Sequence, residues 1–219
     1  MRSRPIRGLY AVTPETSDDD WLCARVDAVL AGGARMIQYR SKRADARLRR
    51  QQAGRLLELC RTHGALLIVN DDVGLARELG ADGVHLGRED MPPAAARVAL
   101  GDGALIGVSC YDSLARGRAA QADGADYVAF GSFFPSAVKP DAVRAPLELL
   151  RAASAFLDLP VVAIGGITPD NARGLIEAGA DALAVISGLF QVPDSRAAAQ
   201  TLAALFPARD EPLSIESGA

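Results

Sequence analysis

The sequence feature that most constrains the fold is a repeat in which short β-prone segments alternate with longer stretches of helical periodicity. Eight such segments occur, and most are continuously apolar, as strands buried on both faces should be. We expect these strands near residues 8–13, 36–39, 66–70, 83–86, 105–109, 127–131, 161–164 and 183–186. Regular alternation of strand and helix is typical of a parallel sheet with crossover helices, and eight repeats predict an α/β fold, the (β/α)8 TIM barrel.

The expected helices are bounded by glycine and proline signals. A Gly-Ala step stands just before four of the expected strands, and glycine there can adopt the left-handed conformation that ends a helix. These glycines are Gly33, Gly80, Gly124 and Gly179, of which the last three are followed by Ala-Asp. Thr168-Pro169 is the opposite signal, an N-cap followed by proline in the first turn, so it predicts the start of the seventh helix.

Length, charge and cysteine content limit the domains, partners and location of the chain. A chain of 219 residues is long enough for one barrel, so we expect residues 1–206 to form a single domain and the polar residues 207–219 to form a flexible C-terminal tail. A net charge of −3 with 5% aromatic residues argues against binding to nucleic acid. The sequence has no long apolar segment and only 3 cysteines, so we expect a cytoplasmic protein with free thiols that does not enter a membrane. The oligomeric state is not fixed by the sequence, which is compatible with a homo-oligomer.

Polar residues accumulate directly after the expected strands, where the loops of such a barrel build the active site. They are Gln38-Tyr39-Arg40-Ser41-Lys42 after the second strand, Asn70-Asp71-Asp72 after the third, Gly87-Arg88-Glu89-Asp90 after the fourth, Ser109 at the end of the fifth, 131–139 after the sixth, Gly165-Gly166 after the seventh and Ser187-Gly188 after the eighth. The sequence therefore predicts that one end of the barrel carries the functional groups.

Asp71 and Asp90 follow neighbouring strands, whose axes should lie about 4.8 Å apart, so both carboxylates can reach one hard cation. Mg²⁺ is the expected ion, because it keeps several waters and binds to one or two carboxylates together with substrate phosphates. Side chains that suit a pyrophosphate stand in the same set of loops, namely Arg40, Lys42, Asn70 and Lys139. An alternative interpretation is that Asp71 caps the third helix and Asp90 caps the fourth, and the spacing alone does not distinguish the two.

A second anion site is indicated at Gly165-Gly166 and Ser187-Gly188, because barrels often bind phosphate with the loops after strands seven and eight. The alternative is that the two glycines only form a tight turn between strand and helix. Two anion sites imply two phosphorylated ligands. The pattern therefore favours a transferase that joins two molecules over an isomerase with one substrate.

In combination and order, these segments resemble the thiamine phosphate synthase family, whose members couple a pyrimidine pyrophosphate to a thiazole phosphate. The resemblance covers nearly the whole barrel. It is carried by Gly8-Leu9-Tyr10, 38–42, Asn70-Asp71-Asp72, 83–87 with Glu89-Asp90, Gly107-Val108-Ser109, 135–139 and 165–168. The resemblance implies a transferase of thiamine biosynthesis with Mg²⁺ as its cofactor and small molecules as its partners.

The resemblance also implies a role for each matching residue. Asp71 and Asp90 would bind Mg²⁺, and Gln38 would face the aminopyrimidine. The pyrophosphate would be held by Arg40, Lys42, Asn70, Ser109 and Lys139, all except Asn70 being catalytic. The phosphate of the thiazole would be held by Ser136 and by backbone groups of Gly166, Ile186 and Ser187. In the family, the bond to pyrophosphate breaks first and leaves a pyrimidine carbocation, which the thiazole nitrogen captures.

Several residues depart from the family pattern. Ser41 replaces a usual Glu, Ser136 and Val138 replace usual Thr residues, and Cys110-Tyr111 replaces the small residue and His that often follow the serine of the fifth strand. Val138 matters most, because its side chain cannot donate a hydrogen bond to the thiazole phosphate. Two alternative functions are a thiazole tautomerase and a binding protein that holds thiamine precursors without turnover. Asn70-Asp71, Asp90 and Lys139 argue against the tautomerase, and retention of both metal carboxylates argues against the binding protein.

Two further residues near the expected site are interpreted as structural. Cys110 follows an active-site strand but has no obvious partner in the sequence that could act as its base. We therefore expect Cys110 to be a buried packing residue and not a catalytic nucleophile. His85 lies on the fourth strand, and we expect a hydrogen-bonded residue of the barrel core there rather than a substrate contact.

Overall fold

The computed structural model describes residues 6–135 and 143–206, and within them eight parallel strands close into a barrel in sequence order. The strands are β1 (Gly8–Val12), β2 (Met36–Tyr39), β3 (Leu66–Asn70), β4 (Gly83–Leu86), β5 (Leu105–Tyr111), β6 (Tyr127–Phe130), β7 (Val161–Ile164) and β8 (Ala182–Val185). The predicted TIM barrel and its eight strands are confirmed. The largest difference is that β5 continues past Ser109 to Tyr111, because its register with β6 shifts between these two residues.

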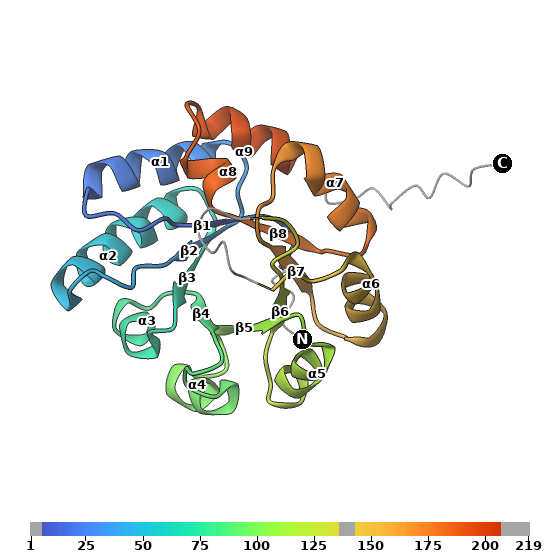
Figure 1. Cartoon of the computed structure of the whole chain (residues 1–219). Coiled ribbons are helices and arrows are strands. Elements are labelled where there is room, and N and C mark those ends of the chain that lie inside the picture. The colour runs from blue at the N-terminus through green and yellow to red at the C-terminus, as the bar shows by residue number, and fades with distance from the viewer. Residues whose placement is uncertain (1–5, 136–142, 207–219) are drawn as a thin grey trace.

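Helices form a ring around the strands, which occupy the centre of the view in Figure 1. They are α1 (Asp19–Ala31), α2 (Ala46–Thr62), α3 (Val73–Leu79), α4 (Pro93–Leu100), α5 (Leu114–Ala122), α6 (Leu147–Phe156), α7 (Pro169–Glu177), α8 (Ser187–Phe190) and α9 (Ser195–Ala203). The short α8 begins at the end of β8, and α9 then packs beside α1 (Figure 1). The contact between the last helix and the first closes the ring.

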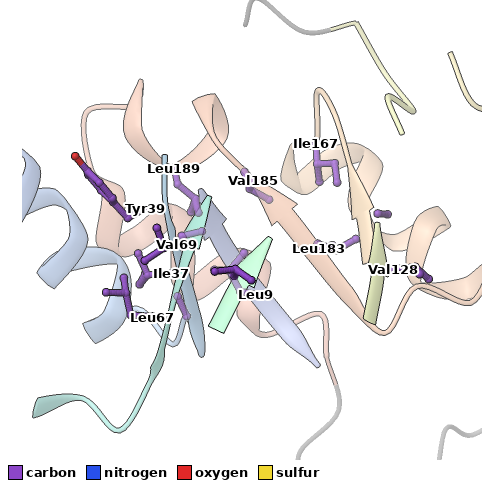
Figure 2. Packing of buried hydrophobic residues seen from close by; sticks show 14 of the residues in the cluster. Leu9, Ile37, Tyr39, Leu67, Val69, Val128, Ile167, Leu183, Val185 and Leu189 are labelled. Atoms are coloured by element: carbon purple, nitrogen blue, oxygen red, sulfur yellow. The ribbon is translucent and has the colours of Figure 1, made fainter. Parts of the chain in front are cut away.

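Alternate side chains of each strand point into two different hydrophobic layers. Outward-facing side chains such as Ile37, Tyr39 and Val69 belong to the layer between the strands and the helices (Figure 2). Inward-facing side chains such as Tyr10 form a second, smaller cluster inside the barrel. Because side chains alternate along a strand, Gln38 must point inward between Ile37 and Tyr39. The pleat of β2 thus directs a polar side chain into the barrel.

The Gly-Ala-Asp junctions stabilise the fold through their aspartate as well as through the predicted glycine. Gly80 is left-handed, with φ 64°, and ends α3, as predicted. The aspartate of each junction then accepts a hydrogen bond from a backbone N–H of the preceding strand. The pairs are Asp82 with Leu67 at 3.0 Å, Asp126 with Ile106 at 2.8 Å and Asp181 with Val161 at 2.8 Å. Each of these aspartates therefore ties together the amino ends of two adjacent strands.

Several local predictions can be compared with the structure. Thr168 is the N-cap of α7 and its N–H donates to Asn171 Oδ1 at 2.9 Å, so the predicted helix start is confirmed. The cysteines are free, as predicted. Across residues 6–135 and 143–206, we find no helix with both the length and the apolar character needed to cross a membrane. The predicted tail at 207–219 lies outside the described residues, and the cytoplasmic location and the oligomeric state stay predictions.

Candidate active site

A pocket of about 170 Å³ lies inside the barrel and reaches the carboxyl ends of the strands. Its wall from β1 to β5 is largely polar, whereas its wall from β6 to β8 is made mainly of small and apolar residues. Five of the residues predicted for the site line it: Gln38, Arg40, Asn70, Ser109 and Ile186. Cavities of about 150 Å³ bind benzene in other proteins, so this pocket has room for a single six-membered ring.

The segment after β2 is held by Glu15, which the sequence alone does not single out. One Glu15 oxygen accepts hydrogen bonds from Ser41 Oγ at 2.8 Å and from Arg43 N at 2.8 Å, and the other accepts one from Lys42 N at 3.1 Å. Slight burial would raise the pKa of Glu15, but the hydrogen bonds from the Lys42 and Arg43 backbone outweigh it and lower the pKa. An ionised Glu15 therefore fixes the backbone that carries Lys42. Ser41, which departs from the family pattern, supplies one of these hydrogen bonds.

The predicted metal ligands Asp71 and Asp90 lie side by side at the rim of the barrel. The carboxyl group of Asp90 is near enough to Asp71 to raise its pKa, and Lys42 Nζ lies 3.1 Å from Asp71 Oδ2. Burial raises the pKa of Asp71, the hydrogen bond with Asp90 raises it further, and Lys42 partly offsets both effects. A carboxylate whose ionisation is disfavoured by burial and by a neighbouring carboxyl group is stabilised by a nearby cation. The chemistry of the pair therefore fits a hard divalent ion such as the predicted Mg²⁺.

Neither carboxylate of this pair caps a helix. The N-cap of α3 is Asp72, whose side chain accepts a hydrogen bond from the N–H of Leu75, the third residue of the helix, at 2.9 Å. The N-cap of α4 is Pro92. Asp90 instead accepts a hydrogen bond from Gly87 N at 2.6 Å, which bends its loop back toward β4. The capping interpretation is therefore wrong for both residues.

The end of β5 has an unusual backbone next to the pocket. Tyr111 has φ 55° and Asp71, on the loop after β3, has φ 63°; non-glycine residues rarely adopt these values, which concentrate at functional sites. Tyr111 lines the pocket, and the guanidinium groups of Arg88 and Arg116 lie 5.1 and 5.5 Å from the centre of its ring. Neighbouring Cys110 is buried, and burial raises the pKa of its thiol to about 12, so the predicted packing role is confirmed.

A buried hydrogen-bond network crosses the interior of the barrel. His85 Nε2 lies 2.9 Å from Ser109 Oγ, and His85 Nδ1 lies 3.1 Å from Tyr127 Oη. Tyr127 Oη lies 2.9 Å from Tyr10 Oη, which accepts a hydrogen bond from Gln38 Nε2 at 2.7 Å. Burial lowers the pKa of His85 to about 4, so its imidazole is neutral at physiological pH. His85 is a hydrogen-bonded core residue, as predicted, and it also lines the pocket.

Gly165 and Gly166, two residues of the second predicted anion site, lie where the loops after β6 and β7 approach each other. Gly165 and Gly166 have φ 108° and 62°, and a Cβ on Gly166 would lie 2.2 Å from Pro135 O. The turn therefore requires these glycines, while their role in phosphate binding stays a prediction. Ser187 begins α8, next to Ile186 at the pocket. Three residues considered for the sixth loop lie outside the described ranges: Ser136, Val138 and Lys139.

Comparison with known proteins places this site in a family. Residues 9–189 match the family model described as thiamine monophosphate synthase. The chain is 57% identical over 202 residues to the thiamine-phosphate synthase of Thioalkalivibrio sulfidiphilus, covering 92% of this chain and 96% of that protein. It is 56% identical over 211 residues to the thiamine-phosphate synthase of Thiobacillus denitrificans, covering 96% and 100%. The solved thiamine phosphate pyrophosphorylase from Pyrococcus furiosus superposes with a TM-score of 0.83 at 38% identity, over 93% of this chain and 97% of that one. The chain therefore belongs to the thiamine monophosphate synthase family and is an enzyme, a transferase.

Proposed function

We propose that this enzyme couples 4-amino-5-hydroxymethyl-2-methylpyrimidine pyrophosphate with thiazole phosphate, giving thiamine phosphate and pyrophosphate. The observation that carries this proposal is the division of the site. Charged groups at the ends of β2, β3 and β4 stand at one side of a pocket whose other wall is small and apolar. The charged side suits a pyrophosphate and the apolar side suits flat rings. The names of the similar proteins, thiamine-phosphate synthases, support thiamine phosphate as the product.

We propose that Asp71 and Asp90 hold Mg²⁺. Within the described parts of the chain, no group of three or more His, Cys, Asp or Glu side chains could hold a metal ion. A pair of carboxylates suits Mg²⁺, which completes its coordination with water and with substrate phosphate. When bound, the ion would neutralise negative charge on the pyrophosphate as it leaves.

The chain's own cations would stabilise the leaving pyrophosphate. Breaking the carbon–oxygen bond places the bonding electron pair on the pyrophosphate, whose negative charge therefore grows in the transition state. Arg40 and Lys42, with Lys139, would bind this charge, while Asn70 and Ser109 would donate hydrogen bonds to it. The backbone of Arg40 is fixed for this role, because its N–H donates to the buried hydroxyl of Thr13 at 2.9 Å.

The pyrimidine carbocation would be captured by the thiazole nitrogen. Gln38 would face the aminopyrimidine, and the apolar wall that includes Val162 and Ala184 would keep water away from the cation. The attacking nitrogen has a lone pair and no proton to lose, so bond formation needs no general base. The phosphate of the thiazole would be held by Ser136 and by backbone groups of Gly166, Ile186 and Ser187.

The proposal is tested by incubating the purified protein with both substrates and Mg²⁺. We expect thiamine phosphate and pyrophosphate in equal amounts, with no product when either substrate is left out and none after chelation of the metal. Binding of both substrates without product would overturn the proposal in favour of a binding protein. Aromatisation of a thiazole precursor without coupling would identify a tautomerase instead.

A further inference from the structure

The buried network joins two residues of the pocket wall through three residues of the barrel interior. Gln38 on β2 and Ser109 on β5 are its ends, and both line the pocket. Tyr10, Tyr127 and His85 lie between them on β1, β6 and β4, and all three are buried. The two ends are thus linked across the barrel by buried side chains.

The position of Tyr127 is fixed by the packing around it. A Cβ on Gly107 of β5 would lie 2.0 Å from Tyr127 Cζ, so the absence of a side chain there gives the ring its place across β5. The Tyr127 ring meets the Tyr10 ring edge to face, with 6.1 Å between centres and an angle of 76°. The imidazole of His85 lies 5.5 Å from the same ring. These contacts hold the hydroxyl of Tyr127 between the two groups that it joins.

When the hydrogens of both phenols and of the imidazole are all used within the network, only two arrangements are possible. The four contacts of the network need one hydrogen each: Gln38 with Tyr10, Tyr10 with Tyr127, Tyr127 with His85, and His85 with Ser109. Each phenol and the neutral imidazole supply one hydrogen. The fourth must therefore come from one end of the network, either Gln38 or Ser109. If it comes from Gln38, every bond points toward Ser109. If it comes from Ser109, every bond points toward Gln38.

We infer that the bonds run from Gln38 to Ser109, so that the network presents Gln38 Oε1 to the pocket as an acceptor and the Ser109 hydroxyl as a donor. The amide group of Gln38 faces Tyr10 with Nε2, which can only donate. Tyr10 must then donate to Tyr127, Tyr127 to His85 Nδ1, and His85 Nε2–H to Ser109. Tyr10, Tyr127 and His85 are positioning residues, because they act through the two ends.

This direction serves both parts of the pyrimidine substrate, an assignment that rests on the proposed function. The exocyclic amino group of the aminopyrimidine is a donor and needs an acceptor, which Gln38 Oε1 supplies. The pyrophosphate is an anion and needs donors, and Ser109 can donate only if its hydrogen is not used by His85. In the reverse arrangement Gln38 would offer N–H to the amino group, and Ser109 would offer lone pairs to the anion. Both contacts would then be repulsive.

The direction is tested in the substrate-free enzyme by ¹⁵N NMR of the histidine ring nitrogens at neutral pH. The sequence has 2 histidines, so the variant His63→Gln isolates the signals of His85. His63 pairs with Asp27 on the outside of the barrel, at 2.8 Å, and is remote from the pocket wall. We expect a single tautomer with the hydrogen on Nε2 and none on Nδ1. A hydrogen on Nδ1, on both nitrogens, or in exchange between them would overturn the inference.

A pair of Tyr→Phe variants separates positioning from stability. Tyr127→Phe removes the hydroxyl in the middle of the network, so His85 should no longer hold one tautomer, and kcat/KM for the pyrimidine pyrophosphate should fall about tenfold. The KM for the thiazole phosphate should stay unchanged. Tyr39→Phe is the matched control, because Tyr39 Oη donates to Gln52 at 2.9 Å in the outer layer and is buried to a similar extent. It should lose comparable stability and leave the His85 tautomer unchanged.

The outcomes distinguish this inference from the proposed function. An enzyme that makes thiamine phosphate but holds His85 with its hydrogen on Nδ1 contradicts only the direction of the network. Equal effects of Tyr127→Phe and Tyr39→Phe on His85 would contradict its positioning role. A protein that forms no product contradicts the proposed function, whatever the tautomer. The spectrum of His63→Gln decides the direction even if Tyr127→Phe fails to fold.

Discussion

Aspartates stand at both ends of this barrel, and their surroundings differ. At the amino end, Asp82, Asp126 and Asp181 each accept a hydrogen bond from the backbone of the preceding strand. At the carboxyl end, Asp71 and Asp90 are in contact with each other, and Asp71 has a left-handed backbone. The first set stabilises the closed sheet, whereas in the second set burial and the neighbouring Asp90 raise the pKa of Asp71. The stabilising aspartates and the proposed metal site are therefore at opposite ends of the barrel axis, as is usual in this architecture.

The largest effect that tests this contrast is expected at the carboxyl end. Asp71→Asn and Asp90→Asn should each lower turnover by on the order of 10²- to 10³-fold, because each removes one charge from the proposed ion site. The free energy of unfolding should stay unchanged or rise, since a repulsion between carboxylates is lost. Rates measured across a series of Mg²⁺ concentrations should show that both variants shift the metal dependence. Full activity of either variant would mean that the metal assignment is wrong.

The opposite pattern is expected at the amino end. Asp181→Ala removes the acceptor of the Val161 N–H and should lower the free energy of unfolding by about 1–3 kcal/mol, as measured by urea denaturation. The kcat of the folded protein should not change. Asp181→Asn is the control, because it keeps an acceptor oxygen and should retain most of the stability. A loss of kcat under conditions where Asp181→Ala stays folded would break the separation between the two ends.

The sequence predicts one part of this contrast and not the other. Strand periodicity and the glycines before the strands are local signals, so the barrel and its helix ends could be read directly. The partner of Asp181 is a backbone N–H on another strand, at Val161, and no local pattern indicates such a contact. The Gly-Ala-Asp repeat therefore predicts where helices end but not how adjacent strands are tied together.

The same limit applies to the candidate site. Sequence spacing could not show whether Asp71 caps a helix, because Asp71 and Asp72 are adjacent and either carboxylate could be the cap. The structure shows that Asp72 is the cap. The network between Tyr10 and Tyr127 joins residues that lie 117 positions apart. Residues that act alone at a strand end could be predicted from their place in the repeat. Residues that act by holding others require the closed barrel to bring them together.

Glu15 sharpens the comparison, because it is an acid at the carboxyl end that behaves like the amino-end aspartates. Its carboxylate accepts backbone hydrogen bonds from Lys42 and Arg43. Glu15→Ala should raise the KM for the pyrimidine pyrophosphate about tenfold, since the segment that carries Lys42 loses its anchor. The stability that Glu15 contributes should be present above its unfolded pKa and lost as pH falls through its lowered folded pKa. Glu15→Gln, which keeps an acceptor oxygen, should have the smaller effect; equal effects would show that the charge rather than the hydrogen bonds is what matters.

The smallest expected effect concerns pH and separates Asp71 from Asp181, since burial raises the pKa of both. A raised pKa in the folded state means that the folded protein binds the proton more tightly than the unfolded chain does. Without divalent metal, the wild type should therefore lose stability as pH rises from the unfolded-state pKa of each aspartate through its folded-state pKa. This loss should be seen relative to Asp71→Asn and also relative to Asp181→Asn, because neither asparagine titrates. Added Mg²⁺ should abolish this loss for Asp71, whose carboxylate it would stabilise, and leave it unchanged for Asp181. Urea denaturation of the three proteins across this pH range, with and without Mg²⁺, measures both differences. If Mg²⁺ changed the pH-dependent loss equally for Asp71 and Asp181, the ion would not be acting specifically at the carboxyl end of the barrel. The proposed difference between the two ends would then be wrong.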